Sequence, residues 1–173
     1  MAPGSPVRTP SASESQASRS AQQQVARTAG IRRVHQAFAW FRSHSRELED
    51  AQLEVTAVAA PPWGESARSQ WLAARFEELA LVDVHRDELG NVFGIRPGTD
   101  PTAPYIALSA HIDTVFPAGT PIEVRRDAGK LYGPGVSDNS SGVVALLAIA
   151  GALRSAELMN TAPILFIDRK SVV

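Results

Sequence analysis

Two apolar runs of strand length, with an apolar helical stretch between them, constrain the fold of this chain most. Tyr105–Ser109 is an apolar run of the kind found in a buried strand. Val143–Leu153 is rich in Ala and Leu and predicts a helix, and Pro163–Ile167 starts a second buried strand. Strand, helix and strand in this order predict a βαβ unit in a parallel or mixed sheet, with Tyr105–Ser109 as a central strand.

The segment before this unit predicts two helices and a pair of short strands. Thr28–Glu49 carries large apolar residues at near-helical spacing, and Glu65–Leu79 keeps its apolar residues on one face, so both predict amphipathic helices. Val82–His85 and Asn91–Ile95 alternate as strands do and flank a hairpin-like turn. The expected fold class is therefore α/β, a mixed sheet flanked by helices, with residues 28–167 as its ordered part.

The first 27 residues differ in composition from the rest of the chain. They are rich in Ser, Ala, Gln and Pro and poor in large apolar side chains, which predicts a disordered, basic, low-complexity leader over residues 1–27. Residues 1–46 hold seven Arg and one Glu, a net charge of +6, and the remainder of the chain carries −7. A targeting segment and a contact for an anionic surface are both open, but the composition favours a dispensable tail.

The composition excludes several classes of function. The chain has 173 residues, no Cys and a formal net charge of −1, so disulfide scaffolds, thiolate zinc fingers and Cys nucleophiles are excluded. The charge balance leads us to expect no nucleic-acid partner. We also expect no membrane association, because the longest apolar stretch, Gly142–Leu153, has 12 residues and a membrane span needs roughly 18.

The first chemically suggestive motif follows the predicted strand at Tyr105–Ser109. His111 and Asp113 are two residues apart, so they point to the same side at the carboxyl end of that strand, where α/β sheets bind ligands. A zinc-binding His commonly donates its second ring N–H to a carboxylate, and the spacing allows Asp113 that role. Taken alone, such a pair is more often a structural or surface pair than a metal site.

The second motif is a Gly-rich loop, LYGPGVSDNSSG, that presents Asp138 just before the helix at Val143–Leu153. The pattern of a dinucleotide-binding loop fails here, because Asp138 stands where the third Gly is needed. A carboxylate held in such a loop can bridge two cations. Asp138 can equally be the N-cap of the helix, and the motif alone leaves both interpretations open.

Taken together, the two motifs resemble a known family. The stretch LSAHIDTVFPAGTPIEVRRDAGKLYGPGVSDNSSGVVALLAIAGAL is similar to the di-zinc amidohydrolases that include peptidase T, glutamate carboxypeptidase, acetylornithine deacetylase and succinyl-diaminopimelate desuccinylase. The upstream stretch APPWGESARSQWLAARFEELALVDVHRDELGNVFGIRPG also looks like the entry region of that family. The resemblance covers about Glu47 to Ile167.

The resemblance implies a role for each motif residue. His111 would be a ligand of one zinc ion, Asp113 the catalytic carboxylate that orients His111, and Asp138 the carboxylate that bridges two zinc ions. The implied reaction is hydrolysis of an amide bond by a zinc-activated water, with a Glu as general base. The continuation Asn139-Ser140-Ser141 departs from the commoner pattern and resembles a related di-zinc aminopeptidase branch.

The end of the chain departs from the family. A Gly-Glu-Glu segment that carries the general base is expected soon after Ile164, but the sequence instead reads DRKSVV from Asp168. These six residues can be encoded by GATCGGAAGAGCGTCGTG, which resembles a sequencing adapter, so we expect residues 168–173 to be extraneous. We therefore expect the N-terminal part of a larger enzyme, truncated before its sheet is complete and inactive alone.

The remaining expectations concern partners and location. A small peptide or an N-acylated amino acid is the implied substrate, a homodimer is possible for the complete enzyme, and a cytoplasmic location is the default. The alternative is a non-catalytic binding or regulatory protein that keeps the fold without a complete metal centre.

Overall fold

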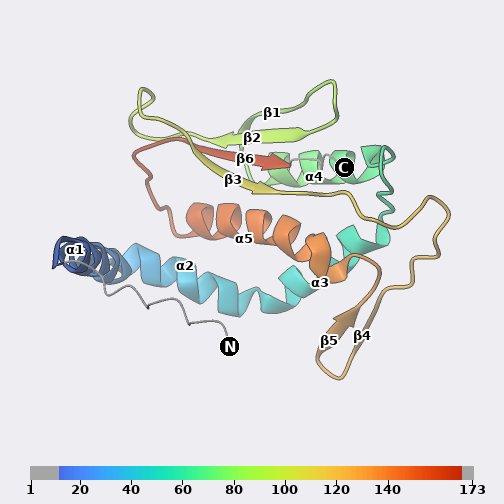
Figure 1. Cartoon of the computed structure of the whole chain (residues 1–173), viewed down its shortest axis with the longest axis horizontal. Coiled ribbons are helices and arrows are strands. Elements are labelled where there is room, and N and C mark those ends of the chain that lie inside the picture. The colour runs from blue at the N-terminus through green and yellow to red at the C-terminus, as the bar shows by residue number, and fades with distance from the viewer. Residues whose placement is uncertain (1–11, 169–173) are drawn as a thin grey trace, which may run out of the picture.

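The computed structural model describes residues 12–168, and residues 1–11 and 169–173 lie outside the described part (Figure 1). The helices are α1 (Ala12–Ala29), α2 (Arg32–Ser43), α3 (Ser45–Ala57), α4 (Ser66–Glu78) and α5 (Gly142–Ser155), with a π-helical turn η1 (Val136–Ser141) directly before α5. The strands are β1 (Val82–Arg86), β2 (Val92–Arg96), β3 (Ile106–Ala110), β4 (Arg125–Asp127), β5 (Lys130–Tyr132) and β6 (Ile164–Asp168).

The four longer strands form one mixed sheet in the order β1-β2-β6-β3. β3 and β6 are parallel, with Ile106 opposite Ile164 and Ala110 opposite Asp168, while β1–β2 and β2–β6 are antiparallel. The chain runs from β3 through the separate β4–β5 hairpin and α5 to β6, so the predicted βαβ unit is present. The predicted fold class, an α/β mixed sheet flanked by helices, is confirmed.

The prediction that Tyr105–Ser109 forms a central strand is wrong. Within residues 12–168, β3 pairs with β6 alone and lies at the edge of the sheet. Ile106, Ala107 and Ser109 of this strand are exposed, and Ile106 keeps 52% of its surface in contact with solvent. The central position belongs to β6, which lies between β2 and β3 and buries every second residue. An apolar run fits a strand but does not reveal how many neighbours that strand has.

The core joins the sheet to α4 and α5. Leu72 and Phe76 of α4, Leu146 of α5, and Val92 and Phe166 of the sheet belong to one buried cluster. Figure 1 shows α5 beneath the sheet and α2 and α3 in a further layer on the other side of α5. The core therefore holds α5 firmly against the strands, and the start of this helix positions the loop that carries Asp138.

The N-terminal helices differ from the prediction. The single helix expected over Thr28–Glu49 is divided among α1, α2 and α3, with breaks at residues 30–31 and at His44. Gly30 lies at the first break, where its high conformational freedom favours the end of a helix.

The disorder predicted for residues 1–27 also differs from the structure, which has a helix from Ala12. Ala, Gln and Arg have high helix propensity, so this segment can be helical without burying a large apolar face. The part of the predicted leader before Ala12 lies outside the described residues.

Among residues 12–168, one helical stretch has the length and composition of a membrane span. This stretch is Val136–Ser155, formed by η1 and α5. We expected no such segment, because the unbroken apolar run Gly142–Leu153 is shorter than a membrane span. Half of this apolar stretch is buried inside the fold, and Val143, Leu146 and Leu147 pack in the core. Burial against the sheet thus accounts for the apolar composition of this helix.

Candidate metal centre

The segment that carries His111 and Asp113 leaves the sheet at the end of β3 and is fixed by backbone hydrogen bonds. Ile112 is fully buried, and its N–H donates to Asp168 Oδ1 at the end of β6 over 3.1 Å. Two residues further on, the N–H of Thr114 donates to the carbonyl of Ala60 over 2.8 Å. The loop is therefore tied both to the sheet and to the connection between α3 and α4.

His111 and Asp113 lie on the same side of this loop, as their spacing predicts. Nδ1 of His111 is 3.2 Å from the backbone carbonyl oxygen of Asp113 and 3.5 Å from its Oδ1. The carboxylate is thus close enough for an ion pair, although the carbonyl is the nearer acceptor. The side chain of His111 is half-buried and that of Asp113 is almost fully buried.

Asp138 is presented by a tight turn before α5. Gly135 has φ +76°, and a Cβ there would lie 2.8 Å from Cγ2 of Thr114, so both conformation and space require glycine. Inside η1, Asp138 and Asn139 depart from helical backbone angles, and the peptide bond between them is cis. Asp138 lies at the surface, with 87% of its side chain exposed.

The structure argues against one of the two interpretations left open for Asp138, the role of helix N-cap. Oδ1 of Asn139 accepts a hydrogen bond from the N–H of Gly142 over 3.1 Å, so Asn139 caps the first turn of α5. Oδ1 of Asp138 instead lies 3.0 Å from Nε2 of His111. The Asp138 carboxylate faces the end of β3 rather than the helix that follows it.

His111 and Asp138 together offer a donor pair suited to zinc. Neutral imidazole nitrogen and carboxylate oxygen are both common zinc donors, and two ligand atoms of one tetrahedral zinc lie roughly 3.3 Å apart. The 3.0 Å separation of Nε2 and Oδ1 is close to that value. Among residues 12–168, no group of three or more His, Asp or Glu side chains is arranged to hold a metal ion. Such a site would therefore have His111 and Asp138 as its donors in the described part of the chain.

A buried arginine lies directly behind the loop. Arg68 of α4 is 1% exposed, and its Nη1 donates to the carbonyl of Ile112 over 2.8 Å. Burial lowers the pKa of Arg68 to about 10, and the nearby carboxylates of Asp113 and Asp168 oppose that shift. The guanidinium thus remains cationic at neutral pH and balances negative charge beneath the candidate site.

Sequence reasoning missed Arg68 and the structural part played by Asp168. Arg68 stands four residues before Leu72, so both lie on the buried face of α4. A charged residue on an otherwise apolar helix face was the sequence feature that could have pointed to Arg68. Asp168 fell in the six residues expected to be extraneous, yet it is the last residue of β6 and is fully buried. The predicted boundary before Asp168 therefore does not coincide with the end of the strand.

Comparison with known proteins gives matches of three kinds. Residues 91–168 match peptidase family M28. An N-carbamoyl-L-amino-acid amidohydrolase of Paenarthrobacter aurescens is 33% identical over 125 residues, which are 70% of this chain and 26% of that protein. The crystal structure of aminoacylhistidine dipeptidase from Vibrio alginolyticus is similar, with a TM-score of 0.54 and 25% identity over 73% of this chain and 28% of the other.

A further crystal structure shares the fold at lower identity. Aminopeptidase PepT from Bacillus cereus has a TM-score of 0.59 and 21% identity, over 69% of this chain and 35% of the other. The chain thus spans between about a quarter and a third of the length of these three proteins.

Proposed function

Because this chain belongs to the superfamily of peptidases and amidohydrolases that includes family M28, we propose that it carries part of a zinc-dependent amide-hydrolysing centre. The observation that supports this most is the contact between His111 Nε2 and Asp138 Oδ1 at 3.0 Å. Two separate motifs bring these atoms together at the carboxyl end of the sheet, where ligands bind in folds of this class.

In this proposal each residue of the site has one role. His111 would give its Nε2 to zinc, and Asp138, exposed and placed opposite it, would be the carboxylate that bridges two ions. Asp113 would hold the His111 ring from the Nδ1 side, through its carboxylate at 3.5 Å and its carbonyl at 3.2 Å. When bound, zinc would supply Lewis-acid activation of water and of the scissile carbonyl.

The proposed substrate class is a peptide or an N-acylated amino acid. Related proteins named as an N-carbamoyl-L-amino-acid amidohydrolase, a dipeptidase and an aminopeptidase all point to an amide bond next to an amino acid. The family resemblance assigns proton transfer to a Glu in a Gly-Glu-Glu segment, which the sequence of this chain does not contain. A cytoplasmic location and a homodimer for the complete enzyme remain part of the same proposal.

For the chain by itself we propose weak zinc binding and no hydrolysis. Two protein ligands are fewer than the three or four that catalytic and structural zinc sites use. The alternative, a non-catalytic binding protein with this fold, shares the expectation of no hydrolysis. It differs in predicting that His111 and Asp138 do not bind zinc.

Isothermal titration calorimetry of the chain with Zn²⁺ tests the proposal. We expect measurable binding that both His111→Ala and Asp138→Ala abolish, because each removes one of two ligands. His35→Ala is the matched control, since His35 is exposed on α2, away from the loop. Binding that survives in both site variants would contradict the proposal and favour the non-catalytic alternative.

A further inference from the structure

Arg68 connects the candidate metal centre to the interior of the fold. Its guanidinium donates to three backbone carbonyls in two different segments. Nε and Nη2 lie 3.0 and 2.5 Å from the carbonyl of Val58, Nη2 lies 3.5 Å from that of Thr56, and Nη1 lies 2.8 Å from that of Ile112. One side chain thus joins the C-terminal end of α3 to the residue between His111 and Asp113.

The peptide groups of Ile112 are held from both directions. Arg68 binds the carbonyl, and Asp168 accepts the N–H over 3.1 Å. Because side chains alternate along an extended segment, the orientation of Ile112 determines where His111 and Asp113 point. The Ile112 side chain is fully buried, and the His111 ring reaches Asp138 through Nε2 and Asp113 through Nδ1.

The charge of Arg68 has a second consequence for the loop. A buried carboxylate is costly unless a cation or hydrogen-bond donors accompany it. Asp113 is almost fully buried, and the positive charge of Arg68 lies close enough to interact favourably with it and with Asp168. Arg68 therefore offsets part of the cost of burying the carboxylate that lies 3.5 Å from Nδ1 of His111.

We propose that Arg68 is a positioning residue of the metal centre: by binding the Ile112 carbonyl and balancing the charge of Asp113, it holds His111 in the orientation that zinc binding needs. This inference rests on the proposed function. Arg68 touches neither His111 nor Asp138 through any of the contacts described above, so its effect on zinc is transmitted by the loop.

Replacing Arg68 by lysine distinguishes the positioning role from the contribution that any long side chain makes by filling the core. Arg68→Lys keeps a positive charge near Asp113 but cannot bond the Val58 and Ile112 carbonyls with one planar group. Arg68→Met removes the charge as well. Arg96→Lys is the matched control. Arg96 is partly buried and likewise donates to a backbone carbonyl, that of Leu158, and to Asn160, but at the opposite end of β6.

Two measurements on each variant test the inference: Zn²⁺ affinity by calorimetry, and the tautomer of His111 in the zinc-free chain by ¹⁵N NMR of the imidazole at pH 8. We expect Arg68→Lys to remain folded and to bind zinc about 10- to 100-fold more weakly, and Arg68→Met to bind more weakly still. In the zinc-free chain, we expect Arg68→Lys to reduce the share of the Nδ1–H form, which donates to Asp113 and leaves Nε2 free for zinc. Arg96→Lys should leave both quantities unchanged.

The outcomes distinguish this inference from the proposed function. If Arg68→Lys binds Zn²⁺ as tightly as the unsubstituted chain and keeps the same His111 tautomer, the positioning role is overturned while zinc binding stands. Equal losses in Arg68→Lys and Arg96→Lys would also overturn it, because they would reflect general destabilisation. Absence of zinc binding in the unsubstituted chain would reject the proposed function, and the His111 tautomer alone would then decide whether Arg68 positions the ring.

Discussion

Nε2 of His111 lies 3.0 Å from Oδ1 of Asp138, although 27 residues separate the two in the sequence. The edge strand β3 delivers His111, and the turn before α5 delivers Asp138. The contact therefore depends on the packing of α5 against the sheet and on the glycines that shape the turn. Each of these elements can be disturbed separately by substitution.

Substitution of Gly142 by Ala should weaken zinc binding without touching a ligand. Alanine ordinarily stabilises a helix, but a Cβ on Gly142 would lie 2.2 Å from Oδ1 of Asn139. The Asn139 side chain must then move, and the adjacent Asp138 with it. We expect a lower melting temperature and reduced Zn²⁺ affinity. A Gly142→Ala chain that is more stable and binds zinc normally would show that the Asn139 cap does not position Asp138.

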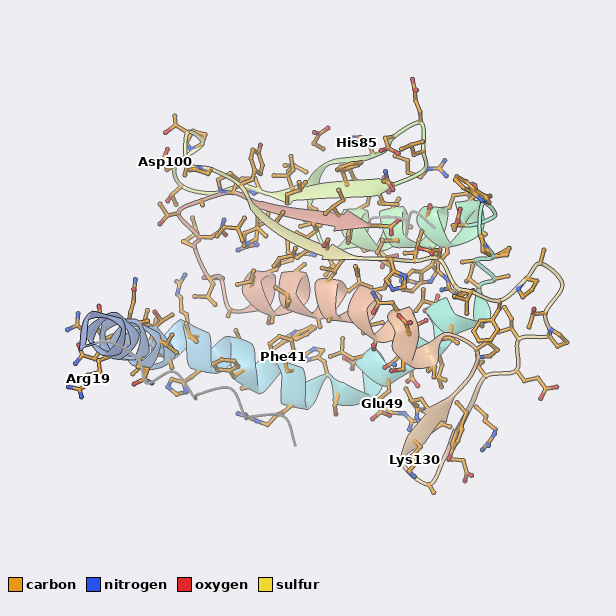
Figure 2. All side chains as sticks on the ribbon, viewed as in Figure 1. Arg19, Phe41, Glu49, His85, Asp100 and Lys130 are labelled. Carbon is orange, nitrogen blue, oxygen red and sulfur yellow. The ribbon has the colours of Figure 1, made fainter. Side chains whose placement is uncertain are left out.

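The β4–β5 hairpin should detach from α3 when Arg126 is replaced by Met. Arg126 is mostly buried and pairs with Glu49 at 3.1 Å and with Asp50 at 2.8 Å. Figure 2 shows Glu49 on α3 beside the hairpin and Lys130 near the hairpin tip. We expect faster amide hydrogen exchange at residues 125–132, with little change in the central strands. Lys130→Met is the control, and equal effects from the two substitutions would argue against this contact.

Asn91→Ala should destabilise the chain at neutral pH and have less effect in acid. Slight burial alone would raise the pKa of Asp87, but hydrogen bonds from the Asn91 side chain and from backbone N–H groups lower it below its ordinary value. A depressed carboxyl pKa stabilises the fold above the unfolded value, roughly 3.9, and this stabilisation disappears as pH falls through the folded pKa.

We therefore expect Asn91→Ala to lower the free energy of unfolding by about 1 kcal/mol at pH 7. The difference from the unsubstituted chain should shrink below pH 4, because Asp87 is then increasingly protonated in both proteins. Urea unfolding followed at several pH values measures this. A difference that stays constant from pH 7 to pH 3 would mean that Asn91 acts independently of the Asp87 charge.

The core contact between α4 and the central strand should dominate stability. The rings of Phe76 and Phe166 meet edge to face with centroids 6.2 Å apart, and both are fully buried. We expect Phe76→Ala to cost about 3–5 kcal/mol, enough to unfold much of a small domain. Phe38→Ala, at an exposed position on α2, is the matched control and should cost far less. Similar melting temperatures for the two variants would contradict this account of the core.

The sequence was sufficient to predict the mixed sheet and the closeness of His111 and Asp113, because both follow from local spacing. The period of two in a strand puts His111 and Asp113 on one side, and the apolar β3, α5 and β6 segments imply the βαβ unit. The edge position of β3 could not be predicted in this way. It depends on which strands pair, and an apolar strand sequence does not specify its neighbours.

The closeness of His111 and Asp138 was implied by the family resemblance and not by their spacing in the sequence. The capping role of Asn139 and the position of Arg68 behind Ile112 escaped prediction, because they join segments distant in sequence or choose among neighbouring polar residues. The helix at Ala12–Ala29 was missed because its composition was judged by its lack of apolar residues rather than by helix propensity.

The most direct measurement of the central claim is a zinc titration followed by the ¹⁵N imidazole resonances of the four histidines. We expect the Nε2 resonance of His111 to shift strongly on Zn²⁺ addition while His35, His44 and His85 stay unchanged, and we expect Asp138→Ala to remove the shift. A response centred on another histidine, or none at His111, would contradict the assignment of His111 and Asp138 to a metal centre.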